Sequence, residues 1–263
     1  MNRACPEREQ LRREVSVFAR KLMLSSQISE LCEAEASPRQ VQFLHRVLSE
    51  EIGRRERSRK SRLLNRAGFP VLKSFEDYEF AEVRFPPAFS REELLSGAFI
   101  QEKRNLVLYG GVGTGKTHMA IALGALACQA NRKVRFHTVT ELVLKLADAY
   151  RSGTLERLVR EIKELELLIL DEWGYVPVDR EGSQLLFRVI ADSYERKSLI
   201  LTTNLEFSKW GGIFTDEQMA AAMIDRLVHH GHLIIFGSKS YRMSHALMRQ
   251  QGPASEGRRK EPA

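Results

Sequence analysis

The chain has 263 residues, a hydrophobic content of 43% and a net charge of +7, which is enough for a large globular domain with a smaller appendage. Because no apolar run could cross a bilayer and the Arg- and Glu-rich start lacks the apolar segment of a secretion signal, we expect a cytoplasmic protein with no membrane partner. Its three cysteines show no Cys-x-x-Cys spacing, which argues against zinc and disulfides, and its positive charge indicates a polyanionic partner if that charge is concentrated in one segment.

Residues 1–67 are predicted to form a small helical N-terminal domain. Ser37 and Pro38 match an N-cap followed by proline in the first turn, so a long helix is expected to begin there. The apolar residues that follow step by three and four positions: Val41, Leu44, Leu48 and Ile52. This stripe must be buried against the first helix or against another subunit.

The same helix becomes strongly basic after Ile52. Seven cations stand against one glutamate between Ile52 and Arg66, and four of the arginines repeat at helical spacing on one face, where like charges repel. A charge run can be a solvated face laced with ion pairs, but few acidic partners are available here. We therefore predict that this helix contacts the phosphate backbone of duplex DNA, with these candidate residues: Arg54, Arg55, Arg59, Lys60, Arg62 and Arg66.

A linker is predicted at residues 68–105. Gly68 suits the position just after the helix, and Pro70 prevents the helix from resuming. The segment is rich in aromatic residues, which are expected to pack on the next domain; as an alternative, some of them cover an adenine base. At the other end of the chain, residues 249–263 are polar and rich in Gly, Pro and charge, which is typical of a disordered tail.

A glycine-rich loop follows an apolar run at 106–109, and a helical pattern of small residues leaves it. Its sequence is Gly110-Gly111-Val112-Gly113-Thr114-Gly115-Lys116-Thr117. The spacing matches the loop in which backbone N–H groups converge on nucleotide phosphates, so we predict ATP binding by this loop and the adjoining His118. Lys116 would bridge the β- and γ-phosphates, and Thr117 would bind Mg²⁺. A plain glycine-rich turn is the alternative, but the strand-loop-helix context favours the nucleotide site.

Strands are expected at 106–109, 134–138, 167–170, 199–203 and 233–236, alternating with helices. Five such strands indicate an α/β fold with a doubly wound, mostly parallel sheet that binds its ligand at the carboxyl ends of the strands. Thr215 and Gln218 match a capping box that would open the helix before the last strand.

Polar residues at two of these strand ends suit ATP hydrolysis. Asp171 is expected to hold Mg²⁺ through its water shell, and Glu172 to polarise the attacking water. Asn204 follows the next strand and would reach the γ-phosphate or the attacking water, although an asparagine there is often only a turn former. Arg226 and Arg242 suit phosphate contact, with surface ion pairs as the alternative.

The residues that carry a family resemblance are the loop 110–117, the strand 167–172, Asn204, Ile224-Asp225-Arg226-Leu227, Ser240-Tyr241-Arg242, and in the N-terminal half 50–66, 68–70 and 73–78. This array resembles the AAA+ ATPases of the DnaC helicase-loader group. Within that group it is most similar to IstB, the ATP-binding helper of an insertion-sequence transposase.

The resemblance implies an AAA+ P-loop NTPase core at residues 106–248 that uses ATP and Mg²⁺. It implies a homo-oligomer that assembles on target DNA and recruits or stimulates a cognate transposase, with ATP hydrolysis as the switch. Arg226 would be an arginine finger acting on the ATP of a neighbouring subunit, and Arg242 a sensor arginine. Because few residues follow the last strand, the helical lid of most AAA+ proteins is expected to be missing or vestigial.

Two alternatives remain open. A loader of a replicative helicase would have the same fold, and its N-terminal helices would bind a helicase instead of DNA and transposase. A phosphoryl-transfer enzyme for a small molecule would need a lid and an acceptor pocket, which the sequence does not show.

Overall fold

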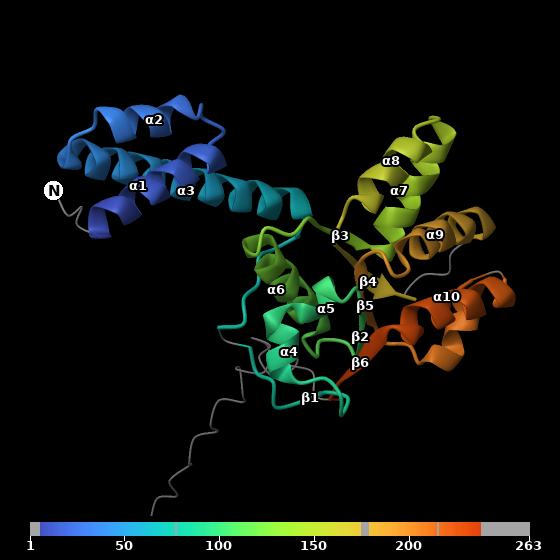
Figure 1. Cartoon of the computed structure of the whole chain (residues 1–263). Coiled ribbons are helices and arrows are strands. Elements are labelled where there is room, and N and C mark those ends of the chain that lie inside the picture. Colours follow the sequence, from blue (N-terminus) through green and yellow to red (C-terminus); the bar gives the residue numbers. More distant parts are fainter. Residues whose placement is uncertain (1–5, 77, 175–178, 215, 238–263) are drawn as a thin grey trace, which may run out of the picture. The chain divides into compact units, whose positions relative to one another are not determined.

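The computed structural model describes residues 6–76, 78–174, 179–214 and 216–237. The chain divides into two compact units, Met1–Arg62 and Leu63–Ala263. The described part of the first unit contains α1 (Pro6–Lys21), α2 (Gln27–Ala34) and most of α3 (Pro38–Ala67), as labelled in Figure 1. None of the described helices is both long and apolar enough to span a membrane.

The first unit is organised around the apolar stripe of α3. Its buried cluster consists of Val15, Leu22, Cys32, Val41 and Leu48, and Leu44 and Ile52 pack against it. The predicted stripe is therefore buried against α1 and α2 of the same chain. Helix α3 begins as predicted, because the backbone N–H of Ser37 donates to Oε1 of Gln40 at 2.8 Å. It ends at Ala67, and Gly68 follows in the left-handed region with φ of 77°.

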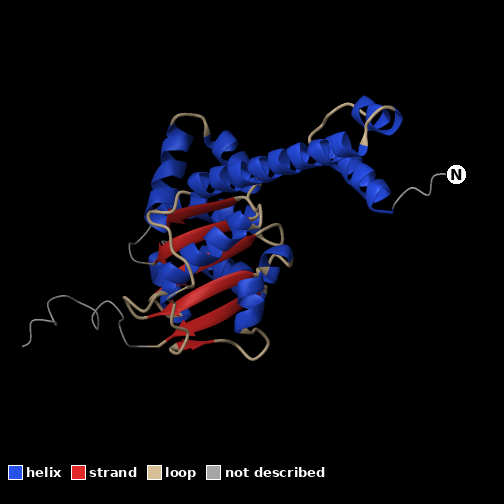
Figure 2. Cartoon of the chain, turned by 90° about the vertical axis from the view of Figure 1, so that its left-hand side faces the viewer, coloured by secondary structure: helices blue, strands red, loops and turns tan. Residues whose placement is uncertain are grey.

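The second unit contains a six-stranded sheet in the order β1-β6-β2-β5-β4-β3. The strands are β1 (Val83–Arg84), β2 (Asn105–Gly110), β3 (Val134–Thr138), β4 (Leu167–Trp173), β5 (Ser198–Thr203) and β6 (Gly231–Phe236). Strands β2 to β6 pair in parallel, whereas β1 runs antiparallel to β6 at the edge. Figure 2 shows the twisted sheet with helices on both faces.

Both faces of this sheet are buried, because alternate residues of each strand enter different cores. Leu168 and Leu170 of β4 belong to one cluster and Leu167 and Ile169 to the other. The first face is covered by α7 (Val139–Arg151), α8 (Leu155–Lys163), α9 (Arg180–Ser193), the 3₁₀ helix η1 (Phe207–Ile213) and α10 (Glu217–His229). The second face is covered by α4 (Arg91–Ser96), α5 (Ala98–Gln101), α6 (Lys116–Gln129) and residues of 63–85.

The structure differs from the sequence prediction in two details. It has one strand more, because the segment predicted as a linker contributes β1 as well as α4 and α5. Strand β1 has two residues and is followed by prolines, so it leaves no periodic pattern. Thr215 lies outside the described residues, and the cap of α10 is Asp216, whose carboxylate accepts from the backbone N–H of Met219 at 3.0 Å.

Gly124 provides a test of the packing between α6 and the sheet. A Cβ added to it would lie 2.7 Å from Cζ of Phe69 and 2.8 Å from Cδ1 of Ile169. Alanine favours a helix by about 1 kcal/mol, yet overpacking should dominate, so we expect Gly124→Ala to lower the free energy of unfolding by about 1–3 kcal/mol. Urea unfolding followed by far-ultraviolet circular dichroism measures the change.

Gly53→Ala on α3 is the matched control for this substitution. Its added Cβ would meet only the flexible guanidinium of Arg57, at 3.3 Å, so we expect it to be neutral or stabilising. A Gly124→Ala protein as stable as the unsubstituted chain would contradict the close contact.

Candidate functional site

The glycine-rich loop connects β2 to α6, and its glycines meet geometric requirements that other residues would not. Gly113 and Gly115 have φ of 79° and 96°, in the left-handed region. A Cβ on Gly110 would lie 2.7 Å from the backbone oxygen of Phe236 in β6, which cannot move aside easily. Gly111 and Val112 are exposed. The loop therefore presents backbone N–H groups at the N-terminus of α6, an arrangement that suits phosphate oxygens.

Lys116 is the first residue of α6, and its side chain turns back into the loop. Its Nζ donates to the carbonyl oxygens of Gly110 at 2.9 Å and Gly111 at 2.6 Å. The residue is only 7% exposed. This ammonium group therefore lies inside the loop, where a point charge can serve the terminal phosphates of a nucleotide.

Asp171 of β4 and Thr117 of α6 come together across the end of the sheet. The hydroxyl of Thr117 donates to Oδ1 of Asp171 at 2.9 Å, and Asp171 is 5% exposed. A hydroxyl and a carboxylate are hard oxygen ligands, the kind that Mg²⁺ prefers. The donor set therefore fits the Mg²⁺ site that the sequence predicts.

Thr202 of β5 joins this group, a role that the sequence pattern did not predict. Its hydroxyl donates to Oδ1 of Asp171 in a short hydrogen bond and accepts from the backbone N–H of Glu172 at 3.1 Å. The register between β4 and β5 shifts here, and Glu172 has φ of 62° and an exposed side chain. Thr202 thus contacts the carboxylate of Asp171 and the backbone of Glu172 through one hydroxyl. The signal available in the sequence was a threonine at the end of an apolar strand, paired with the strand that carries the carboxylates.

Asn204 follows β5 at the same edge of the sheet. The preceding Thr203 pairs with Tyr109 of β2 and with Trp173 of β4, so Asn204 lies beside the strands that carry the loop and the carboxylates. Its Oδ1 is buried and has no hydrogen-bond partner among the described residues. An unpaired buried oxygen is costly, which makes a ligand that donates a hydrogen bond, such as a water molecule, a natural partner for this atom.

Aromatic residues of the preceding segment pack against the N-terminal end of α6. The Tyr78 hydroxyl donates to the carbonyl oxygen of Gly115 at 3.4 Å, and its ring lies 5.0 Å from that of His118. Burial raises the pKa of Tyr78 above its ordinary value. The Nε2 atom of His118 contacts the carbonyl oxygen of Ser74 at 2.7 Å. His118 is therefore held by this segment, at the end of the loop.

Arg226 lies near the amino ends of the strands, whereas the loop lies at their carboxyl ends. It is in the last turn of α10, which Asn105 at the start of β2 anchors: Nδ2 of Asn105 donates to the carbonyl oxygen of Leu227 at 3.2 Å. The Arg226 guanidinium donates to the carbonyl oxygen of Ala222 at 3.0 Å. Because β2 separates the two edges by about 17 Å, Arg226 does not reach the loop of its own chain.

The basic residues of α3 fall into two groups. Arg54 and Arg55 form ion pairs with Glu51, at 2.9 Å and 2.8 Å. The other four candidates, Arg59, Lys60, Arg62 and Arg66, have no ion pair within 4.0 Å in the described part of the chain, and the arginines among them are exposed. The second group is therefore the part of the helix whose charge the protein itself does not neutralise. Arg242 lies outside the described residues, as do the expected vestigial lid and tail beyond residue 237.

Comparisons with known proteins agree with this geometry. The profile of the family described as IstB-like ATP binding protein matches residues 19–248. A protein described as the ATP-binding protein of insertion sequence IS21 in Pseudomonas aeruginosa is 39% identical over 206 residues, which cover 77% of this chain and 76% of the relative. Its counterpart in IS5376 of Geobacillus stearothermophilus is 34% identical over 210 residues, covering 80% and 84%.

A solved structure shows the same fold. The AMPPCP-bound DnaA of Aquifex aeolicus superimposes with a TM-score of 0.50 at 20% identity, covering 62% of this chain and 50% of that one. The predicted AAA+ P-loop NTPase fold, with its mostly parallel sheet and helical N-terminal region, is thereby confirmed.

Thr202 provides a test of the site. We expect Thr202→Val to weaken Mg²⁺-dependent ATP binding by about tenfold, because the carboxylate that faces Thr117 loses the hydroxyl that orients it. Titration of ATP at fixed Mg²⁺ measures the effect. Thr203→Val is the matched control, since its buried hydroxyl bonds the carbonyl oxygen of Trp173 at 2.9 Å and not the carboxylates.

Both valine variants should lose stability to a similar extent, about 1–3 kcal/mol, because each removes a buried hydroxyl from a satisfied pair. Equal loss of ATP affinity in the two variants would assign the effect to strand packing and not to Asp171.

Proposed function

The chain belongs to the family of IstB-like ATP-binding proteins, and we propose that it is an ATP-hydrolysing switch that assembles on duplex DNA and recruits or stimulates a transposase. The observation that carries the proposal is that the loop and Arg226 lie at opposite ends of the strands of one sheet. Each chain then holds half of a hydrolysis site. The exposed arginines of α3 and the insertion-sequence context of the relatives support the DNA and transposase partners.

The proposed reaction is attack of water on the γ-phosphate of ATP, giving ADP and phosphate. The loop and Lys116 would hold the phosphates, and Thr117 and Asp171 would hold Mg²⁺, which would supply further positive charge there. Glu172 is exposed at the edge of the sheet beside Asp171, where its carboxylate accepts a proton from the attacking water. Asn204 orients the water or the γ-phosphate through its side-chain amide.

Arg226 completes the site of a neighbouring subunit in this proposal. In such an interface, the amino ends of the strands in one subunit face the carboxyl ends of the strands in the next. Because the two surfaces differ, the same contact can repeat from subunit to subunit. An arginine placed in this way stabilises the negative charge of the transition state. Hydrolysis therefore depends on assembly, and a single subunit turns over ATP poorly.

DNA binding is assigned to the arginine row of α3. Arg59, Arg62 and Arg66 are exposed on one side of the helix, and no aromatic residue interleaves with them. Contacts with phosphates, without readout of base edges, fit this composition. In this proposal, DNA brings the subunits together, and each ATP site is completed only when two subunits are in contact.

Glu172→Gln separates binding from turnover. The amide keeps the size of the side chain but cannot take a proton, so we expect ATP affinity to be retained and hydrolysis to fall by about 10²- to 10⁴-fold. Phosphate release and equilibrium ATP binding measure the two effects. Turnover at the unsubstituted rate would remove Glu172 from this role.

Mixing two inactive variants tests whether Arg226 acts on a neighbour. Arg226→Ala and Lys116→Ala should each lower turnover by about 10³-fold, whereas their mixture should recover part of it, because some interfaces then pair an intact loop with an intact arginine. The control sample contains only the Lys116→Ala protein, at the total concentration used for the mixture. Absence of recovery at every ratio, with assembly intact by light scattering, would contradict the assignment.

Charge reversal tests the DNA surface. Arg59→Glu combined with Arg62→Glu should lower the affinity for duplex DNA and reduce the slope of log affinity against log salt by about 2, since about 0.9 is lost for each phosphate contact. Fluorescence anisotropy of labelled DNA measures both. The control is Arg39→Glu, an exposed residue in the first turn of the same helix. An unchanged slope would place the DNA elsewhere on the protein.

A further inference from the structure

A buried aromatic cluster adjoins the carboxyl ends of β4 and β5. Its centre is the pair Trp173 and Trp210, the two tryptophans of the chain, whose rings lie 5.2 Å apart between centroids. Neither side chain is exposed to solvent. Phe207 contacts Trp210 with ring centroids 4.8 Å apart, and Phe214 contacts Trp173 at 5.6 Å. Because Trp173 directly follows Glu172 in β4, this cluster packs beside the edge of the sheet that carries the exposed acid.

The two indole N–H groups of the cluster have different surroundings. Nε1 of Trp210 donates to the carbonyl oxygen of Leu205 at 3.2 Å. Nε1 of Trp173 is buried and has no hydrogen-bond partner in the part of the chain that the structure describes. A buried indole usually bonds its N–H to an acceptor. Trp210 therefore contributes a hydrogen bond as well as packing, whereas the ring of Trp173 contributes packing alone.

The hydrogen bond from Trp210 is one of two that hold the backbone of Leu205. The backbone N–H of Leu205 donates to the hydroxyl of Thr203 at 3.0 Å, and that hydroxyl donates to the carbonyl oxygen of Trp173 at 2.9 Å. Because a peptide group is planar, holding the N–H of Leu205 also orients the carbonyl group and Cα of the preceding residue, Asn204. The turn that carries Asn204 is thus tied to β4 through Thr203 and to η1 through Trp210.

Gly174 shows how closely this turn packs against the end of β4. It has φ of 86°, and an added Cβ would lie 2.6 Å from Cδ1 of Leu205 and 2.8 Å from Cδ1 of Ile213. The turn is therefore held by its backbone and by the packing of its neighbours. Oδ1 of Asn204, in contrast, is buried without a hydrogen-bond partner among the described residues. The support of Asn204 thus comes from the residues around it, and its side-chain oxygen remains available to a ligand.

We propose that Trp210 is a positioning residue for ATP hydrolysis, because its N–H holds the Leu205 carbonyl and so keeps the side chain of Asn204 in place. This inference rests on the proposed function, in which Asn204 orients the attacking water or the γ-phosphate. A displacement of about 1 Å at a reacting group can cost about 10²-fold in rate. Binding of the nucleotide is assigned to the loop and Lys116 and does not depend on this turn. Loss of the Trp210 hydrogen bond should therefore lower kcat and leave ATP affinity unchanged.

Replacing each tryptophan by phenylalanine separates positioning from packing. Trp210→Phe removes a bonded N–H, whereas Trp173→Phe removes an N–H without a described partner, and both leave the same smaller ring. We expect Trp210→Phe to lower kcat by about tenfold and Trp173→Phe to keep kcat within about twofold, with ATP affinity retained in both. Phosphate release at saturating ATP, in samples matched for assembly by light scattering, measures kcat. Urea unfolding should show a similar loss of stability in the two variants.

A double-mutant cycle tests whether Trp210 acts through Asn204. Asn204→Ala should lower kcat by about 10²-fold. In that background we expect Trp210→Phe to cause no further loss of kcat, because no side chain remains to be misplaced, although it should still lower stability. Thr203→Val removes the other tie to Leu205 and should show the same pattern, with lower kcat and unchanged ATP affinity. This second variant keeps the test decisive should Trp210→Phe fail to fold.

Unchanged kcat in Trp210→Phe would overturn the proposal. So would equal losses of kcat in both phenylalanine variants, which would assign the effect to packing, or a loss that persists in full in the Asn204→Ala background. Failure of the proposed function gives a different result, because Asn204→Ala would then hydrolyse ATP at the unsubstituted rate, and the role of Asn204 would fall together with that of Trp210. Slow hydrolysis in Asn204→Ala with normal hydrolysis in Trp210→Phe overturns the role of Trp210 alone.

Discussion

The buried carboxylate of Asp171 links the elements of the site. It accepts hydrogen bonds from Thr117 at the start of α6 and from Thr202 in the neighbouring strand. A charge removed from water needs such partners, and here the partners are residues that lie at the loop and at the next strand. The same Thr202 hydroxyl accepts from the backbone N–H of Glu172, which has a positive φ and an exposed side chain. One carboxylate therefore couples the position of the loop to that of the exposed acid.

A parallel sheet buried on both faces leaves its two ends as the places where polar chemistry can occur. The carboxyl end holds the loop, the two acids and Asn204, and the amino end holds Asn105 and the last turn of α10. These ends are separated by the length of a strand, about 17 Å, so no side chain bridges them. Under the proposed function, this separation means that only assembled subunits hydrolyse ATP. DNA and ATP then both act through the same assembly.

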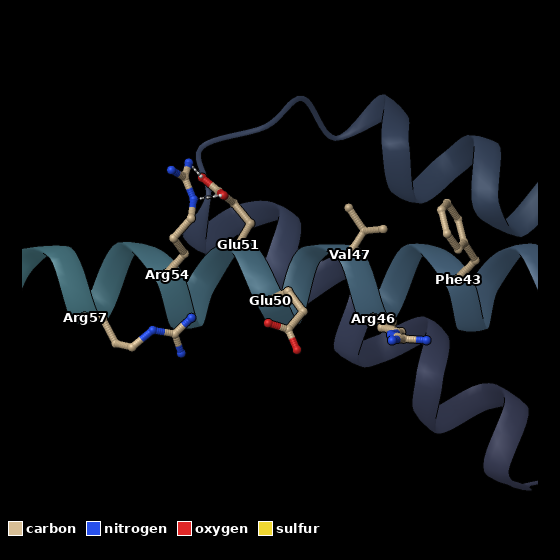
Figure 3. Close-up of a pocket in the computed structure, with 7 residues that line it drawn as sticks. All are labelled: Phe43, Arg46, Val47, Glu50, Glu51, Arg54 and Arg57. Atoms are coloured by element: carbon tan, nitrogen blue, oxygen red, sulfur yellow. Dashed lines mark hydrogen bonds and ion pairs between the residues drawn. The ribbon is translucent and has the colours of Figure 1, made fainter.

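The composition of the α3 surface differs along the helix and around it. Its buried stripe forms the core of the first unit, whereas Phe43 and Val47 of the same helix are exposed (Figure 3). Further along, the arginines lack acidic partners among the described residues. Glu51 marks the boundary, because it neutralises Arg54 and Arg55 and leaves the following cations unpaired.

The sequence by itself determined the elements and the chemistry of the loop, because both depend on local spacing. The alternation of apolar runs and helical patterns predicted the parallel sheet, and the glycine spacing around Lys116 predicted a phosphate loop that the structure forms. Only the tertiary structure decided which residues meet. Thr202 reaches Asp171, Asn105 anchors the turn that carries Arg226, and β1 adds a strand, because these contacts join positions far apart in the chain. Such pairings depend on strand order and register, which periodicity along the chain does not encode.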